Sequence, residues 1–398
     1  MAEKLVLAYS GGLDTSVAVR WIQERYGYDV VTLTANLGNV DNLEEIRQRA
    51  LAAGAVDAHV ADVRDEFIQD FVFPALRANA LYQGVYPIAT ALGRPLIARL
   101  MVETARAEGA TAVAHGCTGK GNDQVRLDVS VGALAPDLKV VAPAREWGMT
   151  RMEEIAYARE HEIPVPSTRE KPYSTDDNLW GRSIEAGVLE DAWREPPENA
   201  YEWTVAPHQA PDEPRYIEVR FDRGVPVALD GAEMDPTPLV ETLSRIGGEH
   251  GIGRIDHIED RLVGIKSREI YEAPAATILL RAHKALEGMV HTRDQIRFGE
   301  TVSREYAQLV YDGLWFSQLR EDLQAYVDSS QRAVTGAVRV KLHKGHATVV
   351  GRRSEHSLYQ TELATYDEGD VFDQAASPGF IHLWGLPIRT QARVRPEE

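Results

Sequence analysis

The sequence has 398 residues, more than one typical domain holds, so we expect at least two domains. Its formal net charge of −18 argues against a large nucleic-acid footprint, and no segment approaches the ~20 apolar residues of a membrane span. The single cysteine, Cys117, excludes an intramolecular disulfide and a cysteine-rich metal site. Because the apolar run before residue 9 is also too short for a signal-peptide core, we expect a cytoplasmic protein.

The first part of the chain alternates strand and helix patterns. Short apolar runs predict strands at 5–8, 29–34, 58–61, 112–116 and 139–142. Apolar residues at helical spacing predict helices at 17–22, 43–51, 67–72, 96–107 and 152–161. Pro95 is expected near the start of the helix at 96–107. Such alternation predicts a parallel sheet with helices on both faces, an α/β domain covering residues 1–165. Ligands bind beyond the carboxyl ends of the strands in such sheets, so the loops after Tyr9, Thr34 and His115 should converge there.

A glycine-rich turn, with the sequence Tyr-Ser-Gly-Gly-Leu-Asp-Thr-Ser at 9–16, joins the first strand to the first helix. Gly11 and Gly12 let an anion approach the main chain closely. The hydroxyl groups of Ser10 and Thr15 add hydrogen-bond donors, and the following helix directs its free N–H groups and positive dipole end at the turn. The turn therefore predicts the phosphate cradle of a nucleotide site. An ordinary strand-to-helix turn with a Ser or Asp cap is the alternative.

The second part of the chain no longer shows the alternation of strand and helix patterns. Pro164, Pro166 and Pro172 interrupt the alternation, so we place the first domain boundary near residue 165. Five prolines between Arg194 and Arg215 predict either a linker or a surface excursion of the second domain.

Strict alternation at 217–221 and 338–342 predicts half-exposed antiparallel strands. A turn at 344–346 should pair the second of these with 347–350 as a hairpin. A long helix is expected from Ser303 to Tyr326, and the stretch at 362–386 is expected to be extended. These patterns predict an α+β domain over residues 166–360, followed by a C-terminal segment at 361–398.

A second dense group of polar residues follows the strand at 112–116. Its sequence, His-Gly-Cys-Thr-Gly-Lys-Gly-Asn-Asp at 115–123, mixes three glycines with several hydrogen-bonding side chains. Folding does not demand that density of donors in one loop, and loops on a rigid sheet commonly carry function. A flexible polar turn is the alternative.

With both loops, the chain resembles the argininosuccinate synthase family of the ATP pyrophosphatase superfamily. That family pairs an Ala-Tyr-Ser-Gly-Gly-Leu-Asp-Thr-Ser loop with a His-Gly-x-Thr-Gly-Lys-Gly-Asn-Asp loop, and both are present here, at 8–16 and 115–123. Further matches follow in order at Arg94-Pro95, Tyr173-Ser174, 177–180, 259–261, 266–272, Phe380-Ile381 and Leu386-Pro387. The resemblance implies an N-terminal nucleotide-binding domain of the ATP pyrophosphatase type, a synthetase domain that binds citrulline and aspartate, and a C-terminal oligomerisation tail.

The resemblance also implies three ligand sites. The residues that the resemblance assigns to the ATP site are Ala8, Tyr9, Ser10, Gly11, Gly12, Leu13, Asp14, Thr15, Ser16, Ala35 and Gly116. Its citrulline-binding residues are Tyr86, Asn122, Arg126, Ser174, Ser183, Glu259 and Tyr271. Its aspartate-binding residues are Thr118, Asn122 and Asp123. The residue chemistry agrees, because Arg126 can hold a carboxylate bidentately and Glu259 offers a negative acceptor.

The implied reaction is a two-step ligation that serves arginine biosynthesis. The ureido oxygen of citrulline attacks the α-phosphate of MgATP, so that pyrophosphate leaves and a citrullyl-adenylate remains. The amine of aspartate then displaces AMP and forms argininosuccinate. Such chemistry needs positioning and charge stabilisation rather than a protein nucleophile. Asp14 is expected either to organise the Mg²⁺ that comes with ATP or to cap the helix, and Asp123 to accept the proton of the aspartate amine.

Partners implied by the resemblance are citrulline, aspartate and ATP, with no nucleic acid and no membrane, and the chain is expected to form a homotetramer. At Ala91 the family often has Ser or Thr in the citrulline site, so either Thr90 or water substitutes or that contact is absent.

Two other functions share the first loop. A tRNA-thiolating ATP pyrophosphatase would usually have catalytic cysteines and a basic face. A nucleotide-sensing assembly protein would leave the second loop unexplained.

Overall fold

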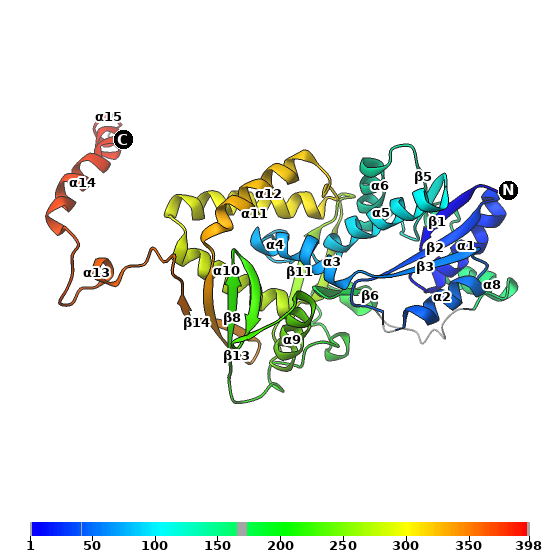
Figure 1. Cartoon of the computed structure of the whole chain (residues 1–398), viewed down its shortest axis with the longest axis horizontal. Coiled ribbons are helices and arrows are strands. Elements are labelled where there is room, and N and C mark those ends of the chain that lie inside the picture. The colour runs from blue at the N-terminus through cyan, green and yellow to red at the C-terminus, as the bar shows by residue number, and fades with distance from the viewer. Residues whose placement is uncertain (1, 41, 165–172, 396–398) are drawn as a thin grey trace. The chain divides into compact units, whose positions relative to one another are not determined.

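The computed structural model of the chain describes residues 2–40, 42–164 and 173–395. It contains two compact units, residues 1–356 and residues 357–398 (Figure 1). In the described part of the chain, no helix is long and apolar enough to cross a membrane. The domain boundary expected near residue 165, with Pro166 and Pro172, lies outside the described residues.

A five-stranded parallel sheet forms the N-terminal part of the first unit, as the alternating pattern predicts. Its strands, in the order β3-β2-β1-β4-β5, are β1 Lys4–Ala8, β2 Asp29–Asn36, β3 Asp57–Asp62, β4 Ala112–Ala114 and β5 Lys139–Val141. Every neighbouring pair is parallel. The loops that follow β1, β2 and β4 therefore start at the same edge of the sheet, as expected.

Helices cover both faces of this sheet (Figure 1). Leu5 and Leu7 of β1 join a core with α1, α2 and α8, whereas Val6 of the same strand joins a core with α5 and α6. The helices are α1 Leu13–Tyr26, α2 Leu43–Ala52, α5 Ala89–Glu108, α6 Asp123–Leu134, α7 Pro143–Glu146 and α8 Arg151–Glu160. The helix expected at 67–72 is a π-helical turn, Phe67–Val72, between α3 Arg64–Glu66 and α4 Phe73–Arg77.

The helix expected at 96–107 is longer than the sequence indicates, because α5 begins at Ala89 and contains Pro95 in its interior. Placing the start at Pro95 was wrong, since tertiary contacts override the local signal. Ala91 is buried in the core, and the side chain of Asn178 donates a hydrogen bond to the carbonyl of Ala89 at 2.8 Å. These contacts stabilise the turns that precede the proline.

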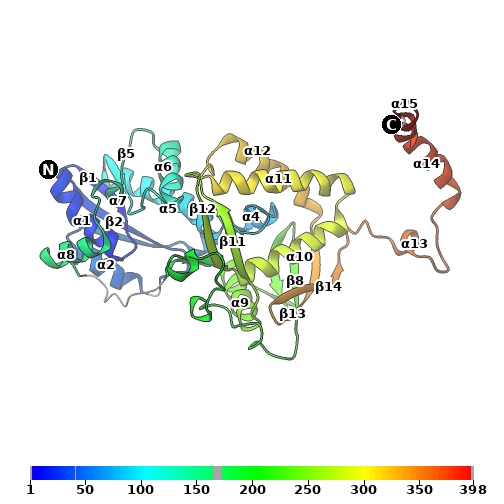
Figure 2. The same ribbon diagram turned by 180° about the vertical axis from the view of Figure 1, so that it is seen from behind.

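Two antiparallel sheets follow, of which the strict alternation at 217–221 and 338–342 predicts only the five-stranded one. A four-stranded sheet of order β11-β12-β7-β6 contains β6 Ser174–Asn178, β7 Gly181–Glu185, β11 Arg254–Asp260 and β12 Lys266–Glu272. Its strands β11 and β12 lie side by side (Figure 2). A five-stranded sheet of order β10-β9-β8-β13-β14 contains β8 Arg215–Asp222, β9 Val225–Leu229, β10 Ala232–Glu233, β13 Gly336–His343 and β14 His346–Arg353. The expected hairpin is confirmed, because Lys344 and Gly345, both with positive φ, join β13 to β14.

The helices of this second part are α9 Pro236–Glu249, α10 Pro274–Val290, α11 Arg293–Tyr311 and α12 Gln318–Ser330. The single helix expected from Ser303 to Tyr326 is therefore wrong. The helix breaks after Tyr311, where Gly313 has a φ of +78° and a Cβ would lie 2.7 Å from Cα of Arg126. The chain turns here because it packs directly against α6, and the apolar spacing carries no signal of that long-range contact.

The proline-rich stretch at 194–215 is a surface excursion of the first unit. The carboxylate of Glu272, which is 0% exposed, accepts hydrogen bonds from the backbone N–H groups of Trp203 and Thr204 at 2.9 and 2.8 Å. It also pairs with Arg182 at 2.8 Å. A buried charge needs such partners, so Glu272 anchors the stretch on β12.

The second unit contains α13 Thr361–Ala364, α14 Ser377–Trp384 and α15 Leu386–Val394. The expectation of an extended stretch at 362–386 is therefore wrong at α13 and again from Gln374 onward, where a 3₁₀ turn at Gln374–Ala376 leads into α14 with Pro378 in its first turn. None of the described side chains at 357–395 is buried within the chain. Phe380 and Trp384, for example, are 62% and 66% exposed.

Candidate active site

The glycine-rich turn forms a loop between β1 and the first turn of α1. Gly12 is the N-cap of α1 and has no side chain with which to occupy the first amides of the helix. The hydroxyl groups of Ser10 and Thr15 lie 3.1 Å apart. The hydroxyl of Tyr9 lies 2.8 Å from Oγ of Ser16. The turn is thus not an ordinary one with a Ser or Asp at the N-cap, and the uncapped first amides of α1 suit an anion.

Arg49 of α2 supports this loop from outside. Its Nη1 donates to the carbonyl of Gly11 at 2.9 Å, and its Nη2 pairs with Glu45 at 2.9 Å. A Cβ at Gly11, whose φ is +76°, would lie 3.2 Å from the same Nη1. The guanidinium group therefore fixes one carbonyl of the loop and adds positive charge beside it. Sequence reasoning missed Arg49, because an arginine four residues after a glutamate indicates an ordinary helical ion pair.

Asp14 lies exposed in the first turn of α1, in hydrogen-bonding contact with the carboxyl group of Glu154 from α8. Burial, together with the charge of Asp14, raises the pKa of Glu154 to about 8. Two carboxyl groups beside a phosphate loop fit Mg²⁺, which is usually held by one or two carboxylates together with substrate phosphates. Glu154 is a second residue that sequence reasoning missed, because it belongs to a helix predicted only from its apolar spacing.

The second loop begins after β4 and lies against the glycine-rich turn at 9–16. A Cβ at Gly116 would lie 3.1 Å from Cγ2 of Thr15, so glycine allows the two loops to approach. His115 accepts the N–H of Cys117 at Nδ1, at 3.2 Å, and contacts Asp128 through Nε2 at 2.7 Å. Because Nδ1 accepts a hydrogen bond, Nε2 carries the proton and donates to Asp128. His115 therefore holds the base of the loop.

The remaining residues expected at the ATP and aspartate sites lie at the same edge of the sheet. Ala8 ends β1, and Ala35 lies near the end of β2. Thr118 is exposed in the second loop, where its carbonyl accepts the N–H of Gly121 at 3.4 Å. Burial raises the pKa of the Cys117 thiol to about 12, so the only cysteine of the chain is a poor nucleophile at neutral pH.

Four of the residues expected to bind citrulline share one face of the sheet β11-β12-β7-β6. They are Ser174, Ser183, Glu259 and Tyr271. Ser183 lies opposite Tyr271 on β12 and opposite Asp176 on β6, two residues after Ser174. Glu259 lies opposite Ser267, four residues before Tyr271. Residues that face each other across antiparallel strands, and alternate residues of one strand, point to the same side. Ser174 is exposed and lies at the end of this row, opposite Glu185.

The carboxylate of Glu259 lies buried between two tyrosine hydroxyls. Tyr271 and Tyr311 each donate to it at 2.5 Å. Burial raises the pKa of both tyrosines, so both hydroxyls keep their protons and donate. Tyr86 stacks on Tyr271 with ring centroids 4.0 Å apart, and its hydroxyl accepts the N–H of Thr90 at 2.9 Å. The sheet residues and Tyr86 thus form one continuous site.

Arg126 of α6 lies beside this cluster. Its Nε donates to the carbonyl of Tyr311 at 2.9 Å, and its Nη1 pairs with Asp123 at 2.9 Å. Its Nη2 is buried and has no hydrogen-bond partner within the described ranges. Asn122 donates to the hydroxyl of Tyr311 at 2.8 Å. A fixed carboxylate and a guanidinium group with one unsatisfied nitrogen suit an amino-acid zwitterion.

Two arginines share the carboxylate of Asp123. Arg126 holds Oδ1, and Nη2 of Arg94 holds Oδ2 at 2.8 Å. The same nitrogen of Arg94 pairs with Asp176 of β6. Burial alone would raise the pKa of Asp123, but the two guanidinium groups outweigh it and hold that pKa at about 2. Burial raises the pKa of Asp176. Asp123 is therefore ionised at neutral pH, which makes it a good counter-ion for an ammonium group and a weak base.

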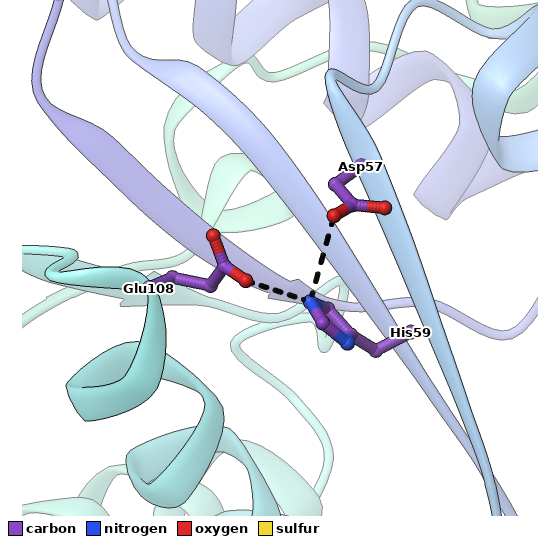
Figure 3. Close-up of side chains that lie close together, drawn as sticks. All are labelled: Asp57, His59 and Glu108. Carbon is purple, nitrogen blue, oxygen red and sulfur yellow. Dashed lines mark hydrogen bonds and ion pairs between the residues drawn. The ribbon is translucent and has the colours of Figure 1, made fainter.

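Within the described ranges, Asp57, His59 and Glu108 form the one group whose three ligand atoms lie within 4.8 Å of one another, as a metal would require (Figure 3). Nε2 of His59 lies 3.0 Å from Glu108 and 4.0 Å from Asp57. The other oxygen of Glu108 pairs with Lys4 at 2.7 Å. Lys4 and Asp57 begin their strands, so the group lies at the amino edge of the sheet, away from the two loops. It is an ion-pair cluster compensated by a lysine, at the wrong edge for a metal that accompanies a nucleotide.

The five-stranded parallel sheet with helices on both faces, followed by two antiparallel sheets, defines an α/β protein whose N-terminal domain has the fold expected of an ATP pyrophosphatase. The family model of the arginosuccinate synthase N-terminal HUP domain matches residues 4–164, and that of the arginosuccinate synthase C-terminal domain matches residues 173–391. The chain belongs to the argininosuccinate synthase family. It is therefore a ligase of arginine biosynthesis.

Relatives with similar sequences cover the chain from end to end. Argininosuccinate synthase of Dehalococcoides mccartyi is 56% identical over 396 residues, 100% of this chain and 98% of the relative. That of Gloeobacter violaceus is 58% identical over 395 residues, 99% of each chain. Among solved structures, a U34-tRNA thiolase from Methanococcus maripaludis covers 42% of this chain and 60% of its own, at 14% identity and a TM-score of 0.26. The two family models and the relatives do not favour the tRNA-thiolating alternative.

Sequence reasoning missed three further residues of the site. Tyr311 lies on a helix face with apolar spacing, where a tyrosine is indistinguishable from a core residue. Arg94 and Asp176 are charged residues whose pairing depends on the packing of α5 against β6. Ala91 is 1% exposed in the core, and the hydroxyl of Thr90 contacts Asp176.

Proposed function

We propose that this chain joins citrulline to aspartate at the site formed by its two loops and the face of sheet β11-β12-β7-β6. The products are argininosuccinate, AMP and pyrophosphate. The observation that carries the proposal is the approach of Gly116 to within 3.1 Å of Thr15, measured from a Cβ built on the glycine. It sets the loop expected to bind aspartate directly against the loop expected to bind ATP.

In the first step, citrulline binds as a zwitterion. Nη2 of Arg126 takes its α-carboxylate, and Glu259 takes its α-ammonium group. The side chains expected to complete the site are Tyr86, Asn122, Ser174, Ser183 and Tyr271. The ureido oxygen then attacks the α-phosphate of ATP, and a citrullyl-adenylate forms. This assignment is supported by the unsatisfied guanidinium nitrogen and by the buried carboxylate between two tyrosines.

Residues 8–16, with Ala35 and Gly116, bind ATP in this proposal. The uncapped amides of α1 receive the pyrophosphate as it leaves, since a helix N-terminus stabilises developing negative charge. Asp14 and Glu154 are the residues that would hold Mg²⁺, which would offset the remaining charge of the pyrophosphate.

In the second step, the amine of aspartate attacks the activated ureido carbon and AMP leaves. Thr118, Asn122 and Asp123 bind aspartate. Asp123, an anion held by two arginines, orients the ammonium group and receives its proton only as a weak base. The positioning of the amine is thus expected to contribute more than proton transfer to this carboxylate.

The finer organisation is part of the same proposal. Residues 1–165 serve as the nucleotide-binding domain, 166–360 as the synthetase domain and 361–398 as an oligomerisation tail of a cytoplasmic homotetramer. The apolar side chains exposed on α14 support a role in assembly. Light scattering of the full chain and of a chain ending at residue 356 tests this. A truncated chain with an unchanged mass per particle would exclude the tail from assembly.

Pyrophosphate release from MgATP tests the function itself, with citrulline and aspartate each present or omitted. We expect release to require citrulline, and AMP and argininosuccinate to appear only when aspartate is added. Folded, ATP-binding protein without citrulline-dependent release would contradict the substrate assignment.

A further inference from the structure

Tyr311 lies where the two charged ends of the proposed citrulline site meet. It is the last residue of α11 and is 1% exposed. Its hydroxyl accepts a hydrogen bond from Asn122 at 2.8 Å and donates one to Glu259 at 2.5 Å. The direction is fixed, because the amide nitrogen of Asn122 can only donate, so the single hydroxyl proton of Tyr311 points to Glu259. The hydroxyl therefore holds one oxygen of Glu259 in place.

The backbone of the same residue holds the cationic end. Its carbonyl accepts Nε of Arg126 at 2.9 Å, and the guanidinium carbon of Arg126 lies 4.7 Å from the centroid of the Tyr311 ring. The left-handed turn at Gly313 brings the chain against α6, so the carbonyl at the helix end reaches the arginine. Nη2 of Arg126 is therefore buried and has no hydrogen-bond partner among the described residues.

The ring of Tyr311 has little freedom to turn. It stacks on Tyr82 with centroids 3.5 Å apart and an interplanar angle of 4°. The hydroxyl of Tyr82 in turn donates to the carbonyl of Asp260, the neighbour of Glu259, at 2.8 Å. A single residue, whose ring is stacked on Tyr82, therefore contacts both one carboxylate and one guanidinium group.

We propose that Tyr311 is a positioning residue that fixes the separation of Glu259 and Arg126 and so matches the site to the zwitterionic head of citrulline. The inference rests on the proposed function. It assigns to the hydroxyl a role at the ammonium end, through Glu259, and to the backbone a role at the carboxylate end, through Arg126. Removal of the hydroxyl should therefore weaken recognition of the ammonium group and leave recognition of the carboxylate intact.

The test is Tyr311→Phe in the full chain, with Tyr306→Phe as the matched control. Tyr306 is a buried tyrosine of the same helix whose hydroxyl bonds Gln324 at 2.8 Å, outside the site. We expect Tyr311→Phe to raise the KM for citrulline roughly tenfold, the effect of losing one hydrogen bond to a charged group, with kcat and the Kd for ATP unchanged. Tyr306→Phe should leave all three unchanged.

An analogue without the α-ammonium group, 5-ureidopentanoate, separates positioning from general damage. Its inhibition constant against citrulline should be the same for wild type and Tyr311→Phe, because it has no group for Glu259 to hold. Equal losses for citrulline and the analogue, or an unchanged KM for citrulline, would overturn the inference. So would the same loss in Tyr306→Phe.

If Tyr311→Phe does not fold, Tyr82→Leu provides a second route. It removes the stacked ring and lets Tyr311 turn, so it should raise the KM for citrulline while the analogue is unaffected, and an unchanged KM would again overturn the inference. A wild-type chain without citrulline-dependent pyrophosphate release would instead contradict the proposed function. The two failures are thus distinguishable.

Discussion

A Cβ at Gly116 would lie 3.1 Å from Cγ2 of Thr15. The loop at 115–123 and the glycine-rich turn at 9–16 are therefore so close that one added methyl group would push them apart. Gly116 follows β4, and Thr15 lies in the first turn of α1, the helix that follows the glycine-rich turn. A displacement of either loop is therefore transmitted to the other. This contact connects the proposed aspartate and ATP sites.

Gly116→Ala should weaken ATP binding by about 1 kcal/mol, because the new methyl group pushes on Thr15 and shifts the loop. Gly119→Ala is the matched control, since a Cβ there meets nothing within 4 Å. Calorimetric titration with ATP measures both. Equal ATP affinity in the two variants would mean that the second loop adjusts without disturbing the first.

Arg126→Ala should weaken citrulline affinity by roughly 1.5–3 kcal/mol, the value of a lost hydrogen bond between charged groups. Arg106→Ala removes an arginine from an exposed pair with Asp137 and should have no effect. Citrulline binding to the ATP-loaded chain is the measurement. An unchanged citrulline affinity would remove Arg126 from the site.

Arg49→Ala should weaken binding of ATP by about 1 kcal/mol more than binding of AMP, because the guanidinium group supports the loop proposed to hold the pyrophosphate. Arg47→Ala is the control, since Arg47 lies on the same helix and pairs only with exposed Glu44 among the described ion pairs. Parallel titrations with ATP and AMP give the comparison. Equal losses for the two nucleotides would assign Arg49 a purely structural role.

Stability should fall as the pH rises toward 8, through the carboxyl group of Glu154. Its pKa of about 8 lies above the value of 4.5 that an unperturbed glutamate has, so the folded chain binds more protons than the unfolded chain between these values. Unfolding free energy therefore decreases as the pH rises from 4.5 to 8. Denaturant titrations of wild type and Glu154→Gln measure this, and the variant should have a flatter dependence. An identical slope in both would show that Glu154 is already ionised in the folded chain.

The parallel sheet and the two loops could be predicted because they depend on local signals: apolar runs, paired glycines and helical spacing. The π-helical turn and the early start of α5 depend on burial, which a single sequence does not display. The break after Tyr311 likewise arises from packing on α6. Local pattern alone therefore joined α11 and α12 into one helix.

Only the part of the candidate site that lies in the family motifs could be predicted from the sequence. Ser183, Glu259 and Tyr271 lie together because the register of three strands aligns them, a relation that only the folded sheet supplies. Tyr311 and Arg94 act through partners more than 25 residues away in the sequence, so no local pattern shows what they contact, although Arg94 belongs to a family match. Residues that belong to the family motifs were thus easier to place than residues that hold them in position.

The proposed assembly through residues 357–395, whose described side chains are not buried, makes activity and stability depend on protein concentration. A segment without a hydrophobic core in its own chain is stabilised by binding to other chains. Its apparent folding free energy then depends on the protein concentration. Rate measurements at nanomolar dilution and melting curves at micromolar concentration would then sample different species. Specific activity should accordingly be determined over a dilution series before any variant is compared with the wild type.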